Sequence, residues 1–262
     1  MKIRAFAIFA LSLPCALHAQ EGVAFPTPES LITRAGAAAQ AQSDRNWQYT
    51  YREDHTQSQV DKHGKPSRPE TRTYEHIMLE GSEYKKLVLI DGLPLDPKTR
   101  KKVDADLEKA RAERRRSLRP SLRRSVSLGS LELLLRLFDN KVTRREIING
   151  RPAWKVESEP KSGIKAASRQ EEEMLATRRT NWFDEQDGYR FHEHIEFERA
   201  TRGVQPGTVL DLLATRVGEQ WLQSDATIRA SMKAMFISGT VESHQHFYDY
   251  KRFQADSTFT PQ

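Results

Sequence analysis

Short segments in which apolar and polar residues alternate, separated by turn signals, recur along most of this chain. Residues 141–148 and 153–158 flank Asn149-Gly150, a pair that tolerates the positive φ angles of a tight hairpin turn. Residues 177–184 and 189–198 flank Asp187-Gly188 in the same way. Strands joined to their sequence neighbours by tight turns pair antiparallel, so the pattern favours an antiparallel sheet over a parallel α/β fold.

The same pattern predicts roughly nine to eleven strands in all. The others are expected from Trp47 to a turn at 63–66, at 70–80, at 83–90 ending in Asp91-Gly92, and within 218–253, with turns near Ser224-Asp225 and Ser238-Gly239. We therefore predict a mainly β fold of α+β type. Its core is a strongly curved antiparallel sheet or incomplete β-barrel with covering helices.

Three helices accompany the predicted strands. Thr27-Pro28-Glu29 is a helix start, with an N-cap, a proline at the first position and an acid in the first turn, and Leu31, Ile32 and Ala35 follow at helical spacing. Asp96-Pro97 starts a second helix, whose apolar residues form one narrow stripe that touches the body along one edge only: Val103, Leu107 and Ala110. Leu128–Phe138 is apolar nearly all round, so this third helix must be buried.

The N-terminus has the layout of a secretory signal peptide. Lys2 and Arg4 precede an apolar stretch, and small residues lie before an expected cut near Ala19. Cys15 almost completes a lipoprotein signal, but Pro14 takes the place of a small residue, so we expect Cys15 to be discarded with the signal. We predict a periplasmic protein without disulfides, with residues 1–19 as the signal and 20–262 as a single domain carrying a helical insertion at about 96–138.

The positive charge of the chain belongs to one segment. The formal net charge is +6, and residues 98–124 hold twelve Lys and Arg against four Asp and Glu, a local +8. In an exported protein the expected anions are phospholipid or glycolipid headgroups rather than nucleic acid, and we expect Arg114, Arg115 and Arg116 to make the contact. The alternative is a solvated helix with intrahelical pairs such as Glu108 and Arg111.

The order of helix, strands, central helices and more strands, with the texts INGRPAWKVESEPK (148–161), TNWFDEQDGYRFHEHIEFE (180–198) and QHFYDYKRFQ (245–254), resembles the outer-membrane lipoprotein-sorting family of LolA, LolB and RseB-like periplasmic proteins. The resemblance covers nearly all of the chain after the signal. It implies an unclosed barrel whose concave apolar face is covered by helices and accepts acyl chains. The basic insertion at 98–124 departs from that carrier pattern.

The leading functional hypothesis is a monomeric, non-enzymatic protein that binds or carries the acyl chains of a lipid or lipoprotein. A buried apolar helix needs a hydrophobic trough, and a curved sheet offers one. The candidate ligand-binding residues are Trp47, Leu131, Leu134, Leu135, Phe138 and Trp154. An ordinary core is the alternative for most of them. The second functional class is a periplasmic sensor or scaffold that contacts another envelope protein.

A metal-dependent enzyme is the third class. His192/His194 and His244/His246 are the weak metal candidates, because residues two apart on a strand share a face. Solvent-facing histidines on the polar face of the sheet are the alternative, and Glu193, Glu196 and Glu198 are expected there as well. The sequence contains neither Gly-x-Ser-x-Gly nor His-Glu-x-x-His, and no glycine-rich phosphate loop. We therefore expect no catalytic residues and no cofactor.

Overall fold

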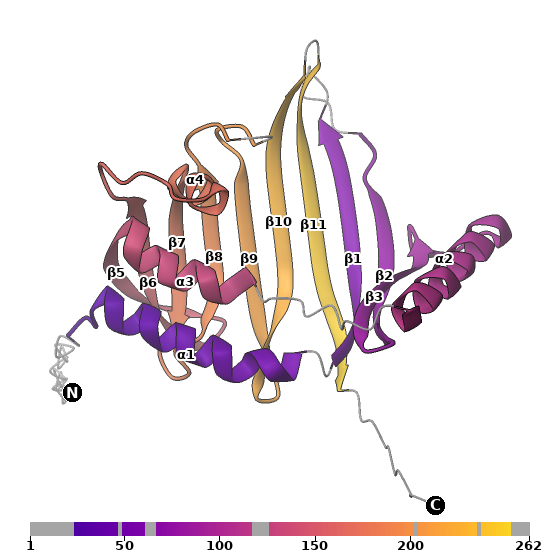
Figure 1. Ribbon diagram of the computed structural model, residues 1–262, viewed down its shortest axis with the longest axis horizontal. Helices are drawn as coiled ribbons and strands as arrows, with labels where there is room; N and C mark the ends of the chain where they lie inside the picture. Colours follow the sequence, from indigo (N-terminus) through magenta and orange to yellow (C-terminus); the bar gives the residue numbers. More distant parts are fainter. Residues whose placement is uncertain are drawn as a thin grey trace, which may run out of the picture.

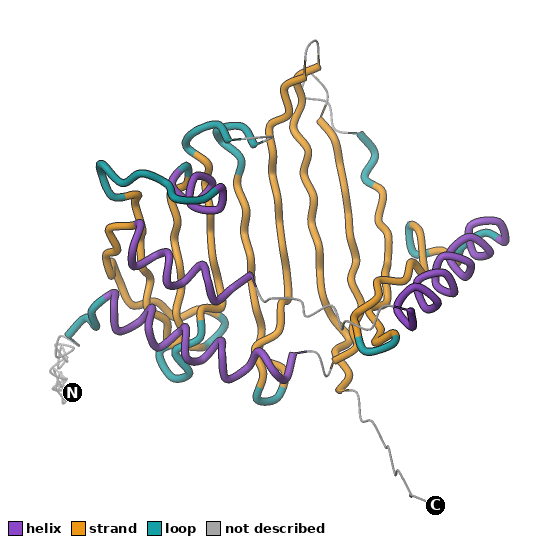
Figure 2. The backbone as a smooth tube through the Cα atoms, in the orientation of Figure 1, coloured by secondary structure: helices purple, strands orange, loops and turns teal. Residues whose placement is uncertain are grey.

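The computed structural model describes residues 24–46, 49–60, 67–116, 126–201, 204–234 and 237–252. Within these ranges the chain forms one eleven-stranded antiparallel sheet that is not closed, together with four helices (Figures 1 and 2). The predicted mainly β fold class is therefore confirmed. The expected signal peptide, Cys15, the cut near Ala19 and Trp47 lie outside the described residues.

The strand order is β4-β3-β2-β1-β11-β10-β9-β8-β7-β6-β5. Every strand pairs with a sequence neighbour except at the centre, where β1 pairs with β11. The sheet is open between β4 and β5, which are separated in sequence by α2 and α3. The strands are β1 (Tyr49–Val60), β2 (Glu70–Leu79), β3 (Ser82–Ile90), β4 (Leu93–Pro94), β5 (Phe138–Ile148), β6 (Arg151–Pro160), β7 (Thr177–Asp184), β8 (Arg190–Phe197), β9 (Val209–Val217), β10 (Gln220–Ala234) and β11 (Ile237–Arg252).

The helices are α1 (Pro28–Asn46), α2 (Pro97–Arg116), α3 (Val126–Leu137) and α4 (Arg169–Leu175). Figure 1 shows α1 and α3 crossing the same side of the sheet in front of β5 to β9, whereas α2 lies at the opposite edge beside β3. The predicted starts of α1 and α2 are confirmed. Thr27 Oγ1 accepts the amide of Ser30 at 3.2 Å, and Asp96 Oδ1 accepts the amide of Lys98 at 2.9 Å.

The main core lies between these two helices and the sheet. Leu31, Ile32 and Ala35 of α1 are buried, as their spacing predicts. They pack in one cluster with residues of α3, α4, β5, β6 and β7: Leu131, Leu134, Leu137, Phe138, Val142, Trp154, Val156, Met174, Leu175 and Phe183. The cluster holds α1 and α3 to one half of the sheet.

Three local predictions were wrong. No turn occurs at Ser224-Asp225, where β10 continues through a register shift between Gln223 and Asp225. Gly239 lies inside β11 and pairs with Met232, so the predicted turn at Ser238-Gly239 is also misplaced. The predicted third helix ends at Leu137, and Phe138 begins β5. The alternation pattern also failed to find β9 and the short helix α4.

Candidate functional site: the open inner face of the sheet

Cross-strand partners project from the same face of a sheet, so the pairing register assigns side chains to faces. One row of partners begins beneath the helices and crosses the molecule from β5 to β2: Val142, Val156, Asn181, Glu193, Leu212, Ala226, Gln245, His55 and Arg72. Because Val142 and Val156 belong to the helix-covered core, the whole row faces that side. We call this side the inner face and the opposite side the outer face.

The inner face is covered over only part of its width. In Figure 1, α1 and α3 lie in front of β5 to β9, and no described helix lies in front of the middle of β11, β1 and β2. α1 reaches β10 at its hairpin end, where Gln42 Oε1 accepts the amide of Trp221 at 2.8 Å. We call the inner-face side chains of this region the open face: Leu210, Leu212, Ala226, Ile228, Ser243, Gln245, Phe247, Glu53, His55, His76 and Lys85. Among them Ile228 and Lys85 are exposed, whereas Ala226, Phe247, Glu53 and His76 are buried and the others are half-buried.

The open face is apolar on one side and polar on the other. On β9 and β10, Leu210 and Ile228 are cross-strand partners, and Ile228 is 37% exposed. The next partner in this row, Ser243 of β11, contacts His55 Nε2 through its hydroxyl at 2.8 Å. An apolar strip beside a row of hydrogen-bonding groups suits a ligand that has an apolar and a polar end.

The polar side centres on Glu53, whose side chain is 98% buried. Its carboxylate contacts His76 Nε2 at 2.7 Å and accepts hydrogen bonds from Lys85 Nζ at 2.6 Å and Gln245 Nε2 at 3.0 Å. His76 Nδ1 contacts Glu83 Oε1 at 2.8 Å on its other side. Two carboxylates, one imidazole and one ammonium are thus joined in one group across β1, β2 and β3.

In this group the hydrogen bonds and charges together shift the pKa values more than burial does. Burial alone would raise the pKa of the Glu53 carboxyl, but the contacts with His76 and Lys85 outweigh it and lower that pKa. Burial would lower the pKa of the His76 imidazole, but the hydrogen bonds to Glu53 and Glu83 outweigh it and raise that pKa. Both shifts favour the charged forms, which are an imidazolium at His76 and a carboxylate at Glu53. Sequence spacing gave no signal for this network, because its members lie on separate strands.

The histidine pairs lie on the outer face, as the polar-face interpretation predicted. His194 Nδ1 and His192 Nε2 both contact Asp211 Oδ1, at 2.9 and 3.3 Å. Burial against the stacked ring of Trp182, whose centroid is 4.1 Å away, is the largest cause that lowers the pKa of His192.

The second pair repeats this arrangement. His246 Nδ1 and His244 Nε2 contact Asp225 Oδ1 at 2.9 and 3.4 Å. Across the described ranges, no group of three or more His, Cys, Asp or Glu side chains is arranged to hold a metal ion. Each pair shares one carboxylate on a neighbouring strand, which accounts for its position without a metal.

Glu193 differs from its expected position. It lies on the inner face, where Arg179 Nη1 at 2.9 Å and Arg190 Nη1 at 3.0 Å bind its carboxylate. The outer-face prediction was wrong for this residue because alternation places it with Ile195 rather than with the histidines. Glu196 does lie on the outer face and pairs with Arg178 at 2.9 Å.

The candidate ligand-binding residues are part of the packed core. Leu131, Leu134, Phe138 and Trp154 are buried, and Leu135 packs against them. In this arrangement they contact α1 and the sheet rather than the open face. A role in ligand binding stays a prediction that requires α3 to shift.

The triple arginine of α2 lies at the end of the helix beside the β2–β3 hairpin. The Arg114 guanidinium donates to the carbonyl oxygens of Leu79, Ser82 and Glu83 at 2.8–3.1 Å. Arg115 pairs with Glu80 at 2.8 Å, and Arg116 is exposed. Two of the three candidate surface arginines therefore bind the rest of the molecule.

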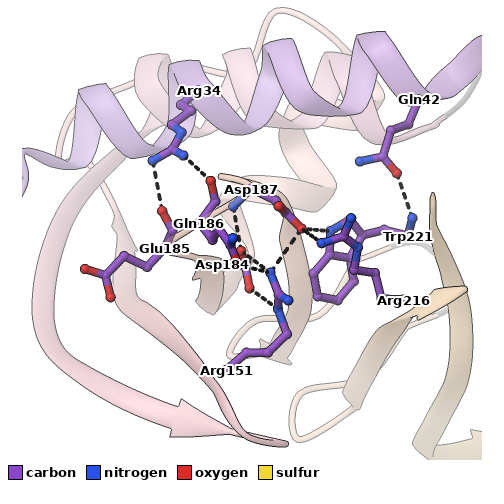
Figure 3. Close-up of polar contacts among 9 residues, drawn as sticks. All are labelled: Arg34, Gln42, Arg151, Asp184, Glu185, Gln186, Asp187, Arg216 and Trp221. Carbon is purple, nitrogen blue, oxygen red and sulfur yellow. Dashed lines mark hydrogen bonds and ion pairs between the residues drawn. The ribbon is translucent and has the colours of Figure 1, made fainter. Parts of the chain in front are cut away.

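A further polar cluster, which the sequence did not reveal, fixes α1 to the turn between β7 and β8 (Figure 3). Arg34 of α1 donates to the carbonyl oxygens of Glu185 and Gln186, at 3.1 and 2.5 Å. Side chains of the sheet bind the same turn on the side away from α1. The Asp187 carboxylate binds Arg151 Nη2, Arg216 Nη1 and Trp221 Nε1 at 3.0–3.1 Å.

Away from the open face, a cavity of about 520 Å³ lies between the 160–166 loop and the residues that follow β8. Lys161 lines it, and its ammonium group donates to the carbonyl oxygen of Leu135 at 3.0 Å. This cavity therefore borders the C-terminal end of α3. None of the helices in the described part of the chain is long and apolar enough to cross a membrane.

Comparison with known proteins gives structural matches only. No family model and no curated protein matches the sequence. A DUF1329 family protein from Desulfovibrio piger superposes with a TM-score of 0.34 and 10% identity, covering 88% of this chain and 94% of its own. The LolA superfamily protein NE2245 from Nitrosomonas europaea gives 0.34 and 10%, covering 90% of this chain and 99% of its own.

A third match is an outer membrane lipoprotein-sorting protein domain from Vibrio parahaemolyticus. Its TM-score is 0.34 and its identity 9%, covering 88% of this chain and 95% of its own. Scores at this level carry no functional argument.

Proposed function

We propose that this protein binds the acyl chains of a lipid or lipoprotein on the open face, as a periplasmic binding or carrier protein rather than an enzyme. One observation carries the proposal. The inner face that forms the core beneath α1 and α3 continues onto β10, where Ile228 is 37% exposed, and then onto β11, β1 and β2, whose middle has no described helix in front of it. A soluble sheet normally buries such a face against another layer.

An acyl chain could provide that missing layer. Each methylene group that moves from water onto an apolar surface contributes about 0.8 kcal/mol. Leu210, Leu212 and Ile228 offer an apolar strip beside the main core. In this proposal α3 is a cover, and a small shift of α3 would let Leu131, Leu134, Leu135, Phe138 and Trp154 extend the strip.

The polar side of the open face gives the ligand an orientation. The strip on β9 and β10 receives the chain, while Ser243, His55 and Gln245 lie where a glycerol, ester or amide group would follow it. The predicted signal peptide supports a periplasmic setting for this binding, and the basic helix α2 is proposed to contact anionic headgroups.

The test compares two substitutions at neighbouring positions of β10. Ile228→Lys places a charge on the open face, and Thr227→Lys places the same charge on the outer face, where Thr227 pairs with Asp211. Binding is measured with an environment-sensitive fluorescent fatty acid. Lipid extracted from the purified wild-type protein, examined by native mass spectrometry under gentle conditions, gives an independent readout.

We expect Ile228→Lys to weaken fatty acid binding about tenfold, because the apolar contact of one Ile side chain is lost, and Thr227→Lys to leave it unchanged. Equal effects of the two substitutions would contradict binding on the open face. A wild-type protein that retains no lipid and binds no fatty acid would contradict the proposed function and favour contact with another envelope protein.

A further inference from the structure

One side of α2 is occupied by contacts with the sheet. A helix turns by about 100° per residue, so Val103, Leu107, Ala110 and Arg114 share one side. The first three are half-buried, and Arg114 binds three carbonyl oxygens of the β2–β3 hairpin. The predicted apolar stripe therefore holds the helix to the body, as expected.

The opposite side of α2 carries a row of cations. Lys98, Lys102, Lys109 and Arg116 follow one another in steps of four and seven residues, which brings them onto one line about half a turn away from Leu107. All four are exposed, and the residues between them on this line, Ala105 and Ala112, are small. We call these four residues the cationic row.

The acids of α2 leave this row positively charged. Asp104 Oδ1 lies 3.5 Å from Lys86 Nζ, and Glu108 pairs with Arg111 on the flank of the helix. Asp106 is exposed and lies four residues after Lys102 and three before Lys109, so it flanks the row. Glu113 lies beside the row, 4.0 Å from Lys109, in a contact between two exposed side chains. Exposed pairs of this kind are weak, so the row keeps most of its positive charge.

The cationic row has the shape and chemistry of a contact with a flat anionic surface. From Lys98 to Arg116 a helix rises about 27 Å along a straight line. Three of the four cations are lysines, which act as mobile point charges rather than as bidentate forks for one defined anion. A diffuse layer of headgroup phosphates needs only such charges, whereas sequence-specific nucleic acid recognition needs groups that reach base edges.

We propose that α2 docks on an anionic bilayer surface through Lys98, Lys102, Lys109 and Arg116. The inference rests on the proposed function for its setting, since a lipid-binding protein must meet a membrane. It also moves the contact away from Arg114 and Arg115, which bind the hairpin. α2 contacts Tyr84 and Lys86, which alternate along β3 with the inner-face residue Lys85. Docking therefore leaves the open face accessible.

The experiment measures co-sedimentation with phosphatidylcholine vesicles, with and without phosphatidylglycerol, over a series of salt concentrations. The test variant is Lys98→Gln/Lys102→Gln/Lys109→Gln. The control variant, Arg178→Gln/Arg229→Gln/Lys251→Gln, removes the same charge from exposed residues of the sheet. We expect the wild type and the control to bind anionic vesicles alike. Partitioning of the test variant should be about a hundredfold weaker at low salt, and all binding should fade as salt rises.

Three results would contradict docking through the cationic row. Equal losses in the two variants would assign the binding to net charge, and no preference for phosphatidylglycerol would exclude an anionic surface. Stronger binding to polyglutamate than to vesicles would favour an acidic protein as the partner. Fatty acid binding in the absence of vesicles is measured on the same variants. It should be unchanged, so a failure of docking is distinguished from a failure of the proposed function.

Discussion

His76 illustrates how the open face is stabilised at the scale of single residues. Its ring is buried and lies between the carboxylates of Glu53 and Glu83, while Tyr51 stacks on it with a centroid distance of 4.2 Å. The raised pKa of His76 means that folding favours the imidazolium. This contribution to stability is fully present below the ordinary imidazole value of 6.5 and is lost as pH rises through the raised pKa.

The corresponding prediction concerns the substitution His76→Gln. We expect the free energy of unfolding to fall by about 2 kcal/mol near pH 6, because the buried Glu53 carboxylate and the half-buried Glu83 carboxylate lose the cation between them. The wild type should lose stability as the pH rises from about 6.5 through the raised pKa of His76, and the variant should lack that part of the pH dependence. Urea unfolding at a series of pH values measures both effects. His246→Gln, on the exposed outer face, is the control, and an unaltered pH profile in His76→Gln would contradict the assignment.

At the scale of elements, the position of α1 depends on a turn. Gly188 has a φ of +71°, and a Cβ atom there would lie 2.6 Å from Cγ of Arg34, the residue that clamps the Glu185 and Gln186 carbonyl oxygens. Glycine is therefore required at this position for two reasons. It allows the left-handed backbone, and it leaves room for the clamp between β7 and α1.

We expect Gly188→Ala to destabilise the protein by about 2 kcal/mol, of which about half comes from backbone strain. Gly207→Ala is the matched control, because its φ is +79° and nothing lies within 4 Å of the added Cβ. Gly207→Ala should lower the free energy of unfolding only by the contribution of the backbone strain. In an Arg34→Ala background the difference between the two glycine substitutions should vanish. Thermal or urea unfolding of this double-mutant cycle measures the coupling, and additivity would show that Arg34 does not occupy that space.

The elements that the sequence predicts well are those specified by nearby residues. Asn149-Gly150 forms its tight turn with φ values of +50° and +77°, and β7 spans the predicted 177–184. Asp225 was misread as a turn residue because its partners, His244 and His246, come from a strand about twenty residues later. The candidate site was unpredictable for the same reason, since Glu53, His76 and Gln245 meet only when β1 pairs with β11.

At the scale of the whole molecule, that pairing joins two halves. β11 pairs with β10 over residues 237–246 and with β1 over residues 240–252, although β1 lies near the other end of the described chain. Contacts so distant in sequence carry a large closure entropy and form only when the flanking hairpins support them. The free edges, β4 and β5, lie where α2 and α3 interrupt the strands. The sheet thus depends on its centre more than on its edges.

Two deletions test this dependence. A chain that ends at Ala234 lacks β11 and leaves β1 and β10 without their shared partner, so we expect it to lose cooperative urea unfolding and to expose apolar surface to dyes. A chain in which a short Gly-Ser linker replaces Pro97–Arg116 loses a helix without buried residues, and should unfold cooperatively with a midpoint near that of the wild type. Circular dichroism follows both transitions. Cooperative unfolding of the chain without β11 would mean that the two halves of the sheet fold independently, because neither half would then need the central pairing to bury its inner face.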